Sequence, residues 1–267
     1  MKVFIGVGHG GRDPGAVGLV RESEANLNMA LGMKEELEKH GIVVGISRTT
    51  EADDSLAEEI MEANEFEPDV AVEVHNNAGR GKGFEVYVQT NSFGEQSQKL
   101  ARSIEEKVEA HGQNSRGLKI KKNGADTDYF GWLRRVNAPS VLCEGFFVDN
   151  AEDCAQFDTE EKQKEYGRVY ALGVLDYLGI NPDEEKPPKI SSYYSVQTGS
   201  FLHKRNAERM KNKLYPDYDT VFILHCQESY RVCVGKFSDR KEAELQKKEL
   251  AEQGYRSFIK RFKEEIL

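Results

Sequence analysis

Three residues with reactive side chains stand at the ends of apolar runs. They are His9, His75 and Glu144, and the runs before them are expected to form β-strands. The carboxyl ends of parallel strands meet along one edge of a sheet, where open α/β proteins bind their ligands. Two imidazoles and a carboxylate, far apart in the sequence, are therefore expected to converge on one point.

A third potential metal ligand stands where the first long helix is expected to begin. Glu22 and Glu24 follow the glycine-rich loop that leaves His9. Two imidazoles and one carboxylate, with a position left for water, form the usual ligand set of a catalytic zinc ion. Glycines around His9 would let the backbone pass close to the metal. Taken singly, each residue also has an ordinary role, because loop histidines are common and acidic residues favour the first helical turn.

Glu144 is the most informative of these residues. A carboxylate that follows Ser-Val-Leu-Cys and precedes Gly-Phe-Phe is costly to bury unless it is paired or functional. The structural alternative is a salt bridge with Arg134 or Arg135. His75 is also unusual, because it interrupts an apolar strand with a side chain that titrates near neutral pH.

The elements that would position these residues alternate between strand and helix over residues 1–180. Apolar or alternating runs predict strands, and helical periodicity predicts the helices between them. Strands are expected at 2–7, 43–46, 70–74, 83–90 and 140–147, and helices at 22–40, 55–66, 96–111 and 164–178. This order predicts an α/β fold with a mixed, mostly parallel sheet flanked by helices.

A second, smaller module is expected after a linker. Residues 181–190 hold three prolines and five charged residues, which predicts a short, stiff connection between domains at 1–180 and 191–267. Beyond it, Tyr194–Phe201 is repeated by Tyr230–Phe237 at an offset of 36 residues. Each copy reads as a strand, a glycine turn and a helix, which predicts a small α+β domain of ferredoxin-like type.

Four motifs lie in order along the first domain. They are Val7-Gly8-His9-Gly10-Gly11-Arg12-Asp13-Pro14-Gly15, Glu22-x-x-x-Asn26-Leu27-x-x-Ala30, Val74-His75-Asn76-Asn77-Ala78 and Val141-Leu142-Cys143-Glu144-Gly145-Phe146. Together they resemble the zinc-dependent N-acetylmuramoyl-L-alanine amidases of the Amidase_3 class, over about residues 2–178. The family usually has an isoleucine or leucine and a small residue around the second histidine, where this sequence has Glu73-Val74-His75-Asn76-Asn77.

The resemblance implies a role for each residue of the site. His9, Glu22 and His75 would bind Zn²⁺, with Glu22 preferred to Glu24 because it stands four residues before the motif asparagine. Zinc would carry the attacking water, and Glu144 would take its proton and pass it to the leaving L-alanine nitrogen. The bond cleaved would be the amide between the lactyl group of muramic acid and L-alanine of peptidoglycan.

Two further residues are candidates for contact with the substrate, Asn77 and Arg116. Arg116-Gly117 resembles the Arg-Gly turn that precedes a substrate-facing strand in the family. A zinc peptidase that acts on peptidoglycan stem peptides would use the same ligands and is the alternative enzyme. A glycan-binding protein with an inactive catalytic domain is the alternative without catalysis, and the intact set of four residues argues against it.

The repeated module also resembles a family. Val196-Gln197-x-Gly199-x-Phe201 and its echo around Gly235 are similar to the SPOR domains, which bind the glycan strands of peptidoglycan. The resemblance covers about residues 191–263 and implies that this module anchors the enzyme to the cell wall. Tyr194, Gln197 and Ser200 are candidates for glycan contact. A generic ferredoxin-like module is the alternative.

Charge and hydropathy exclude other classes of partner. The chain has a net charge of −9, made up of −13 over residues 1–189 and +4 over residues 190–267, and the acidic first part argues against a nucleic acid as its substrate. No apolar run is long enough to span a bilayer.

Without a recognisable signal peptide, we expect synthesis in the cytoplasm and action on the wall after release or lysis. A phage endolysin, released by a holin-type partner, and an autolysin that lyses the sporulating mother cell both fit. The sequence carries no signal for an oligomeric state.

Overall fold

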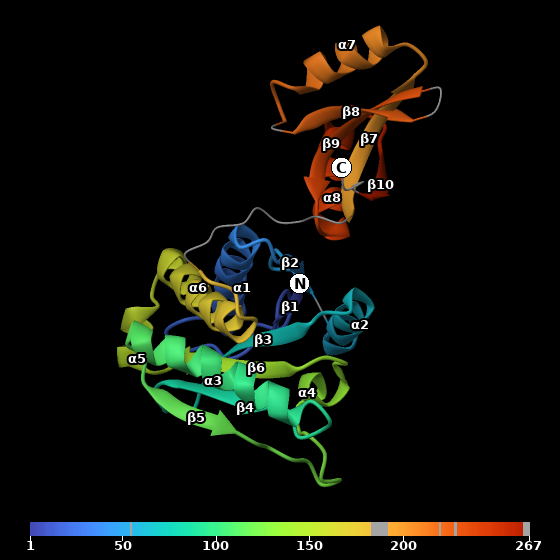
Figure 1. The fold of residues 1–267 in the computed structure, drawn as a ribbon. Coiled ribbons are helices and arrows are strands. Elements are labelled where there is room, and N and C mark those ends of the chain that lie inside the picture. Colours follow the sequence, from blue (N-terminus) through green and yellow to red (C-terminus); the bar gives the residue numbers. More distant parts are fainter. Residues whose placement is uncertain (54, 183–191, 219, 227–228, 264–267) are drawn as a thin grey trace. The chain divides into compact units, whose positions relative to one another are not determined.

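The computed structural model describes residues 1–53, 55–182, 192–218, 220–226 and 229–263 (Figure 1). The chain divides into two compact units, Met1–Lys189 and Ile190–Leu267, and each is described by itself. Most of the expected linker, residues 183–190, lies outside the described residues.

The first unit is built on a six-stranded sheet with the strand order β2-β1-β3-β6-β4-β5. Neighbouring strands are parallel except for β4 and β6, which are antiparallel. The expected mixed, mostly parallel sheet is therefore confirmed. Its elements are β1 (Lys2–Val7), α1 (Glu22–Lys39), β2 (Val43–Ile46), α2 (Leu56–Phe66), β3 (Val70–Asn77), β4 (Phe84–Val88), α3 (Gly94–His111), β5 (Ser115–Lys119), α4 (Gly131–Arg135), β6 (Ser140–Phe147), α5 (Ala151–Gln156) and α6 (Glu160–Tyr177).

Helices cover both faces of this sheet (Figure 1). Helices α1, α3 and α6 pack on one face over the larger apolar core, and α2 and α4 pack on the other around Phe4 and Trp132. The central strands are buried on both sides, which explains why they read as continuous apolar runs. None of the described helices has both the length and the apolarity that crossing a membrane requires.

Two elements differ from the expectation in a way that affects the site. Strand β3 does not end at Val74 but continues through His75 to Asn77, so the histidine is held by the sheet and not by a loop. Arg116 and Gly117 lie inside strand β5 and not in a turn before it. Gly117 has a φ of 84° there, and the pairing of β4 with β5 shifts register nearby.

Helices α1 and α6 approach each other at two glycines. A Cβ atom at Gly167 would overlap with the backbone of Met29 in α1, and one at Gly32 would overlap with the backbone of Lys164. Because neither position has room for a methyl group, the helices are locked in one relative placement. This contact fixes α1, whose first residue is Glu22.

The second unit is a four-stranded antiparallel sheet with the order β10-β7-β9-β8. Its elements are β7 (Ser192–Phe201), α7 (Lys204–Leu214), β8 (Val221–Cys226), β9 (Ser229–Phe237), α8 (Arg240–Glu252) and β10 (Phe258–Lys263). The two copies of the sequence repeat form β7 and β9, which pair with each other, and each leads into a helix. Apolar residues of both helices pack on Val196, Val232 and Val234 of the sheet, as expected for a small α+β domain.

The contact between α1 and α6 gives a stability prediction. Gly167→Ala places a methyl group against the Met29 carbonyl, so we expect a loss of about 1–3 kcal/mol in the free energy of unfolding. Denaturant unfolding measures this loss. Gly124→Ala is the matched control, because a Cβ there meets nothing within 4 Å, and its effect should stay within about 0.5 kcal/mol. Equal stability of the two variants would contradict the tight contact.

Candidate active site

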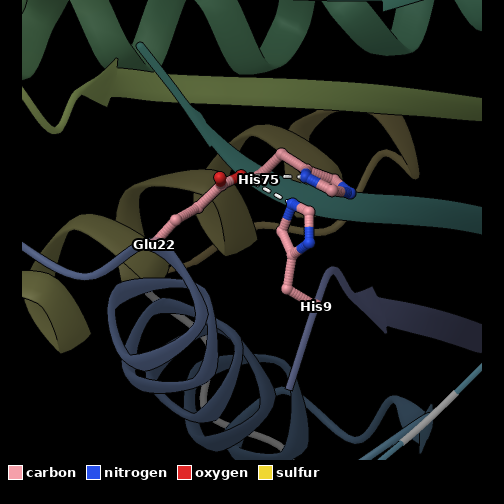
Figure 2. Close-up of side chains that lie close together, drawn as sticks. All are labelled: His9, Glu22 and His75. Carbon is pink, nitrogen blue, oxygen red and sulfur yellow. Dashed lines mark hydrogen bonds and ion pairs between the residues drawn. The ribbon is translucent and has the colours of Figure 1, made fainter. Parts of the chain in front are cut away.

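The side chains of His9, Glu22 and His75 point toward one another (Figure 2). His9 lies in the loop after β1, Glu22 is the first residue of α1, and His75 lies in β3. One carboxylate oxygen, Glu22 Oε1, lies 3.3 Å from His9 Nε2 and 3.0 Å from His75 Nδ1. Glu24 is not part of this cluster and instead pairs with Arg21. The structure therefore brings together the residues that the motifs suggested, from three separate elements.

Glu22 is buried, and both of its oxygens accept hydrogen bonds. The backbone N–H of Ala16 donates to Oε2 at 2.8 Å, and that of Asn76 donates to Oε1 at 3.2 Å. Burial alone would raise the pKa of this carboxyl, but hydrogen bonds from His75 and His9 outweigh burial and lower the pKa well below its usual range. Glu22 is therefore charged at neutral pH and available as a ligand.

The loop that carries His9 is closely fitted to the site. His9 has a φ of 64°, in the left-handed region, which costs energy for a non-glycine residue. Asp13 Oδ2 lies 2.9 Å from His9 Nδ1 and turns Nε2 toward Glu22. A Cβ atom at Gly8 would overlap with the His75 ring, and one at Gly15 would crowd Glu22 and His9. The glycines thus let the loop close around the three side chains.

The site attracts positive charge. Hydrogen bonding with Glu22 raises the pKa of His9 despite burial. Burial would lower the pKa of His75, but hydrogen bonds to Glu22 and Glu73 and the charge of Glu144 hold that pKa well above its usual value. Carboxylates thus dominate the local potential, which favours either protons on the imidazoles or a cation between them.

The three residues fit a zinc ion. Each offers one donor atom, and the three donors lie within 4.8 Å of one another. Ligands held at about 2.0–2.1 Å from a tetrahedral ion lie about 3.3 Å apart, close to the 3.0 and 3.3 Å between Glu22 Oε1 and the two imidazoles. Imidazole nitrogen with carboxylate oxygen is also the donor chemistry that catalytic zinc sites use.

Glu144 lies beside this cluster on β6, in register with His75 of β3. Its Oε2 is buried and has no hydrogen-bond partner. Burial raises the pKa of this carboxyl to about 7, with the charge of His75 acting in the opposite direction. The structural alternative is not realised among the described residues, because neither Arg134 nor Arg135 pairs with Glu144, and Arg134 instead donates to the carbonyls of Asp128 and Tyr129. A half-buried carboxyl with a near-neutral pKa and an unpaired oxygen suits proton transfer.

Asn77 and Arg116 meet at a residue that the sequence did not single out, Glu85. Asn77 Nδ2 donates to Glu85 Oε1 at 2.9 Å, and Arg116 Nε donates to Glu85 Oε2 at 2.8 Å. Glu85 of β4 is in register with Glu144 of β6, and its charge contributes to the raised pKa of Glu144. The two candidates for substrate contact therefore lie next to Glu144.

Buried polar side chains support the site from the α1 side of the sheet. They are Arg48, which the sequence did not single out, and the motif residues Asn26 and Asn76. Arg48 is only 2% exposed and donates to the carbonyls of Val7, Gly8 and Ser23, which belong to the end of β1 and the start of α1. Asn26 and Asn76 bond to each other at 2.7 Å, linking α1 to β3. An arginine or an amide is usually a surface residue, so no pattern in one sequence marks these as buried.

The candidates for glycan contact in the second unit differ in exposure. Ser200 is exposed, Tyr194 is half-buried against the core of that unit, and Gln197 is only 3% exposed. Gln197 follows Val196, whose side chain faces the helices, so alternation along β7 places Gln197 on the opposite face of the sheet.

Comparison with known families agrees with this architecture. Residues 3–176 match the Amidase_3 family, described as N-acetylmuramoyl-L-alanine amidase, and residues 191–261 match the SPOR domain. Because the first match spans more than half of the chain, the chain belongs to the N-acetylmuramoyl-L-alanine amidase family. It is a peptidoglycan amidase with a cell-wall-binding SPOR domain.

Individual relatives extend over both units or over the first. A sporulation-specific N-acetylmuramoyl-L-alanine amidase of Bacillus subtilis is 29% identical, with 84% of this chain and 85% of the relative aligned. The endolysin of Bacillus phage SPP1 is 30% identical over 77% of each chain. The crystal structure of an N-acetylmuramoyl-L-alanine amidase from Clostridium difficile 630 superposes with a TM-score of 0.60 at 28% identity, covering 67% of this chain and 96% of the other.

The support beneath the site can be tested at Arg48. Arg48→Met removes three hydrogen bonds to buried carbonyls, so we expect a loss of about 2–4 kcal/mol in the free energy of unfolding. Arg102→Met, at an exposed position of α3, is the control and should change stability by less than about 0.5 kcal/mol. If chemical denaturation finds the two variants alike, Arg48 does not hold β1 and α1 together.

Proposed function

We propose that the chain is a zinc-dependent amidase that cleaves the bond between the muramic acid lactyl group and L-alanine. His9, Glu22 and His75 would hold the zinc ion, and Glu144 would move the proton. The observation that carries this proposal is the convergence of two imidazoles and a buried carboxylate beside an unpaired carboxyl oxygen. The family match supports the bond that is cleaved.

When bound, zinc supplies a water of lowered pKa and polarises the scissile carbonyl. The remaining steps belong to residues of the chain. Glu144, as the carboxylate, accepts the proton of the attacking water and then donates it to the amide nitrogen, which cannot leave as an anion. A pKa of about 7 suits both halves of this transfer, because the carboxyl exchanges its proton readily near neutral pH.

Arg116 and Asn77 would position the stem peptide. Arg116 uses Nε for Glu85, which leaves the rest of its guanidinium group to bind a carboxylate of the substrate. The guanidinium also lies 5.1 Å from the centre of the Phe147 ring, a cation–π contact that holds the side chain over the end of β6.

The remaining residues, 191–267, would keep the enzyme on its substrate. We propose a division into a catalytic domain over 1–180, a linker over 181–190 and a glycan-binding domain over 191–267. Of the three candidates for glycan contact, the exposed Ser200 fits this role, whereas Gln197 is buried and Tyr194 packs against the core of the unit. The SPOR match supports binding to the wall. A connected binding domain raises the local concentration of the catalytic domain along the glycan strands.

Two cellular settings fit a peptidoglycan amidase of this kind. One aligned relative is named as sporulation-specific and another as an endolysin. By analogy, the protein would act on the wall after lysis of a mother cell, or after release from an infected cell with the help of a holin-type partner.

The reaction can be tested on purified peptidoglycan by mass spectrometry of the soluble products. We expect free stem peptides that begin at L-alanine, together with glycan strands whose lactyl groups are unsubstituted. A chelator should abolish both products, and added zinc should restore them. Shortened peptides that remain attached to muramic acid would instead identify a zinc peptidase, and activity unaffected by chelation would contradict the metal site.

The role of Glu144 gives a second prediction. Glu144→Gln keeps the size of the side chain but cannot accept the proton, so turnover should fall by at least about 100-fold. Zinc content and thermal stability should stay at the wild-type level, because Glu144 is not among the clustered donors. Glu106→Gln, at an exposed position of α3, is the control. Retained activity in Glu144→Gln would exclude this residue as the acid and base.

A further inference from the structure

Glu73 is a buried carboxylate that the proposed reaction does not use. It lies on β3, two residues before His75, so the two side chains share a face of the sheet. Glu73 is 1% exposed, and its Oε1 lies 3.3 Å from His75 Nε2. Its other oxygen, Oε2, is buried without a hydrogen-bond partner. A carboxylate in such surroundings is costly, so its position calls for a function.

The neighbouring strand makes room for this pair of side chains. Gly6 of β1 is in register with Glu73, and Gly8 follows two residues later, next to His75. A Cβ atom at Gly6 would overlap with the Glu73 carboxylate, and one at Gly8 would overlap with the His75 ring. Two glycines thus stand where any larger residue would displace the carboxylate or the imidazole. The pair is accommodated by the backbone of β1.

The contact determines which nitrogen of His75 is available to a metal. A neutral imidazole carries one N–H, and its other nitrogen is the acceptor or ligand. Both nitrogens of His75 face carboxylates, Nδ1 toward Glu22 Oε1 at 3.0 Å and Nε2 toward Glu73 Oε1 at 3.3 Å. A metal ion held with Glu22 would take the lone pair of Nδ1, and Glu73 would then keep the remaining proton on Nε2. When a histidine binds a metal through one ring nitrogen, a carboxylate that accepts the N–H of the other ring nitrogen orients the ring and strengthens metal binding.

We propose that Glu73 is a positioning residue for the metal centre. By accepting the Nε2–H of His75, it fixes the tautomer and the ring orientation that present Nδ1 to zinc. This inference rests on the zinc site proposed above. Glu73 does not act as a fourth ligand, because its oxygen contacts Nε2, whereas Glu22 contacts Nδ1.

The test uses the full chain and measures its zinc affinity by competition with a chromogenic chelator. Glu73→Met keeps a similar volume but offers no acceptor, and we expect zinc binding to weaken about 10- to 100-fold. The unfolding midpoint of the metal-free chain should not fall, since the substitution removes an unpaired buried oxygen. Glu73→Gln retains an acceptor oxygen and should recover most of the affinity. Glu73→Leu serves as the apolar variant if Glu73→Met does not fold.

Glu59 offers a matched control, because it is a second buried carboxylate that contacts β1. Its Oε1 accepts hydrogen bonds from the Val7 N–H and the Ser47 hydroxyl, each at 2.8 Å, and it does not contact an imidazole in these bonds. Glu59→Met should therefore lower the unfolding midpoint and leave zinc affinity within about twofold of wild type. Opposite patterns in the two variants would separate a positioning role from a structural one.

The outcomes distinguish this inference from the proposed function. If the wild-type chain binds no zinc, both are wrong. If it binds zinc tightly and Glu73→Met binds equally well, only the role of Glu73 is wrong. Equal weakening in Glu73→Met and Glu59→Met would show a general loss of structure and overturn the positioning role. Equal weakening in Glu73→Gln and Glu73→Met would also overturn it, because an accepted hydrogen bond would then not be responsible.

Discussion

The burial of one negative charge, that of Glu22, determines how the site is assembled. A carboxylate inside a protein must be compensated by donors or positive charge. Glu22 draws its donors from the loop after β1, from the imidazole of His75 and from the backbone of β3. Three segments that are distant in the sequence are therefore held at one carboxylate. The same charge that requires these donors in the absence of metal suits a divalent cation between the imidazoles.

The sheet and its helices serve this assembly by placing the reactive groups on one face. On β3 and β6, His75, Glu73 and Glu144 lie on the side of the sheet that bears α2 and α4, while Asn76 lies on the side of α1. Glu22 reaches the cluster from the start of α1, and the close contact between α1 and α6 fixes that start. A rigid scaffold thus determines the spacing of the donors, as preorganised sites require.

Residue order and pattern predicted the sheet and the convergence of His9 and His75, whereas the choice of Glu22 over Glu24 depended on the family resemblance. Apolar runs located β1, β3 and β6, and reactive residues at their ends indicated a shared edge. The short elements β5, α4 and α5 were missed, since five or six residues carry little periodicity. Glu73 and Arg48 were missed for a different reason: their roles depend on contacts across strands, which a single sequence does not specify.

Two buried oxygens without partners, Glu73 Oε2 and Glu144 Oε2, remain in a unit whose other buried carboxylates are bonded through backbone or side-chain donors. Both belong to residues beside His75, one along β3 and the other across on β6. Folded proteins rarely leave such groups unpaired, and they tolerate the cost where function requires it. An unpaired oxygen on Glu144 can accept a proton without first breaking an existing bond. The two unpaired carboxylate oxygens beside His75 lower the stability of the fold, and the favourable packing of the rest of the sheet offsets this cost.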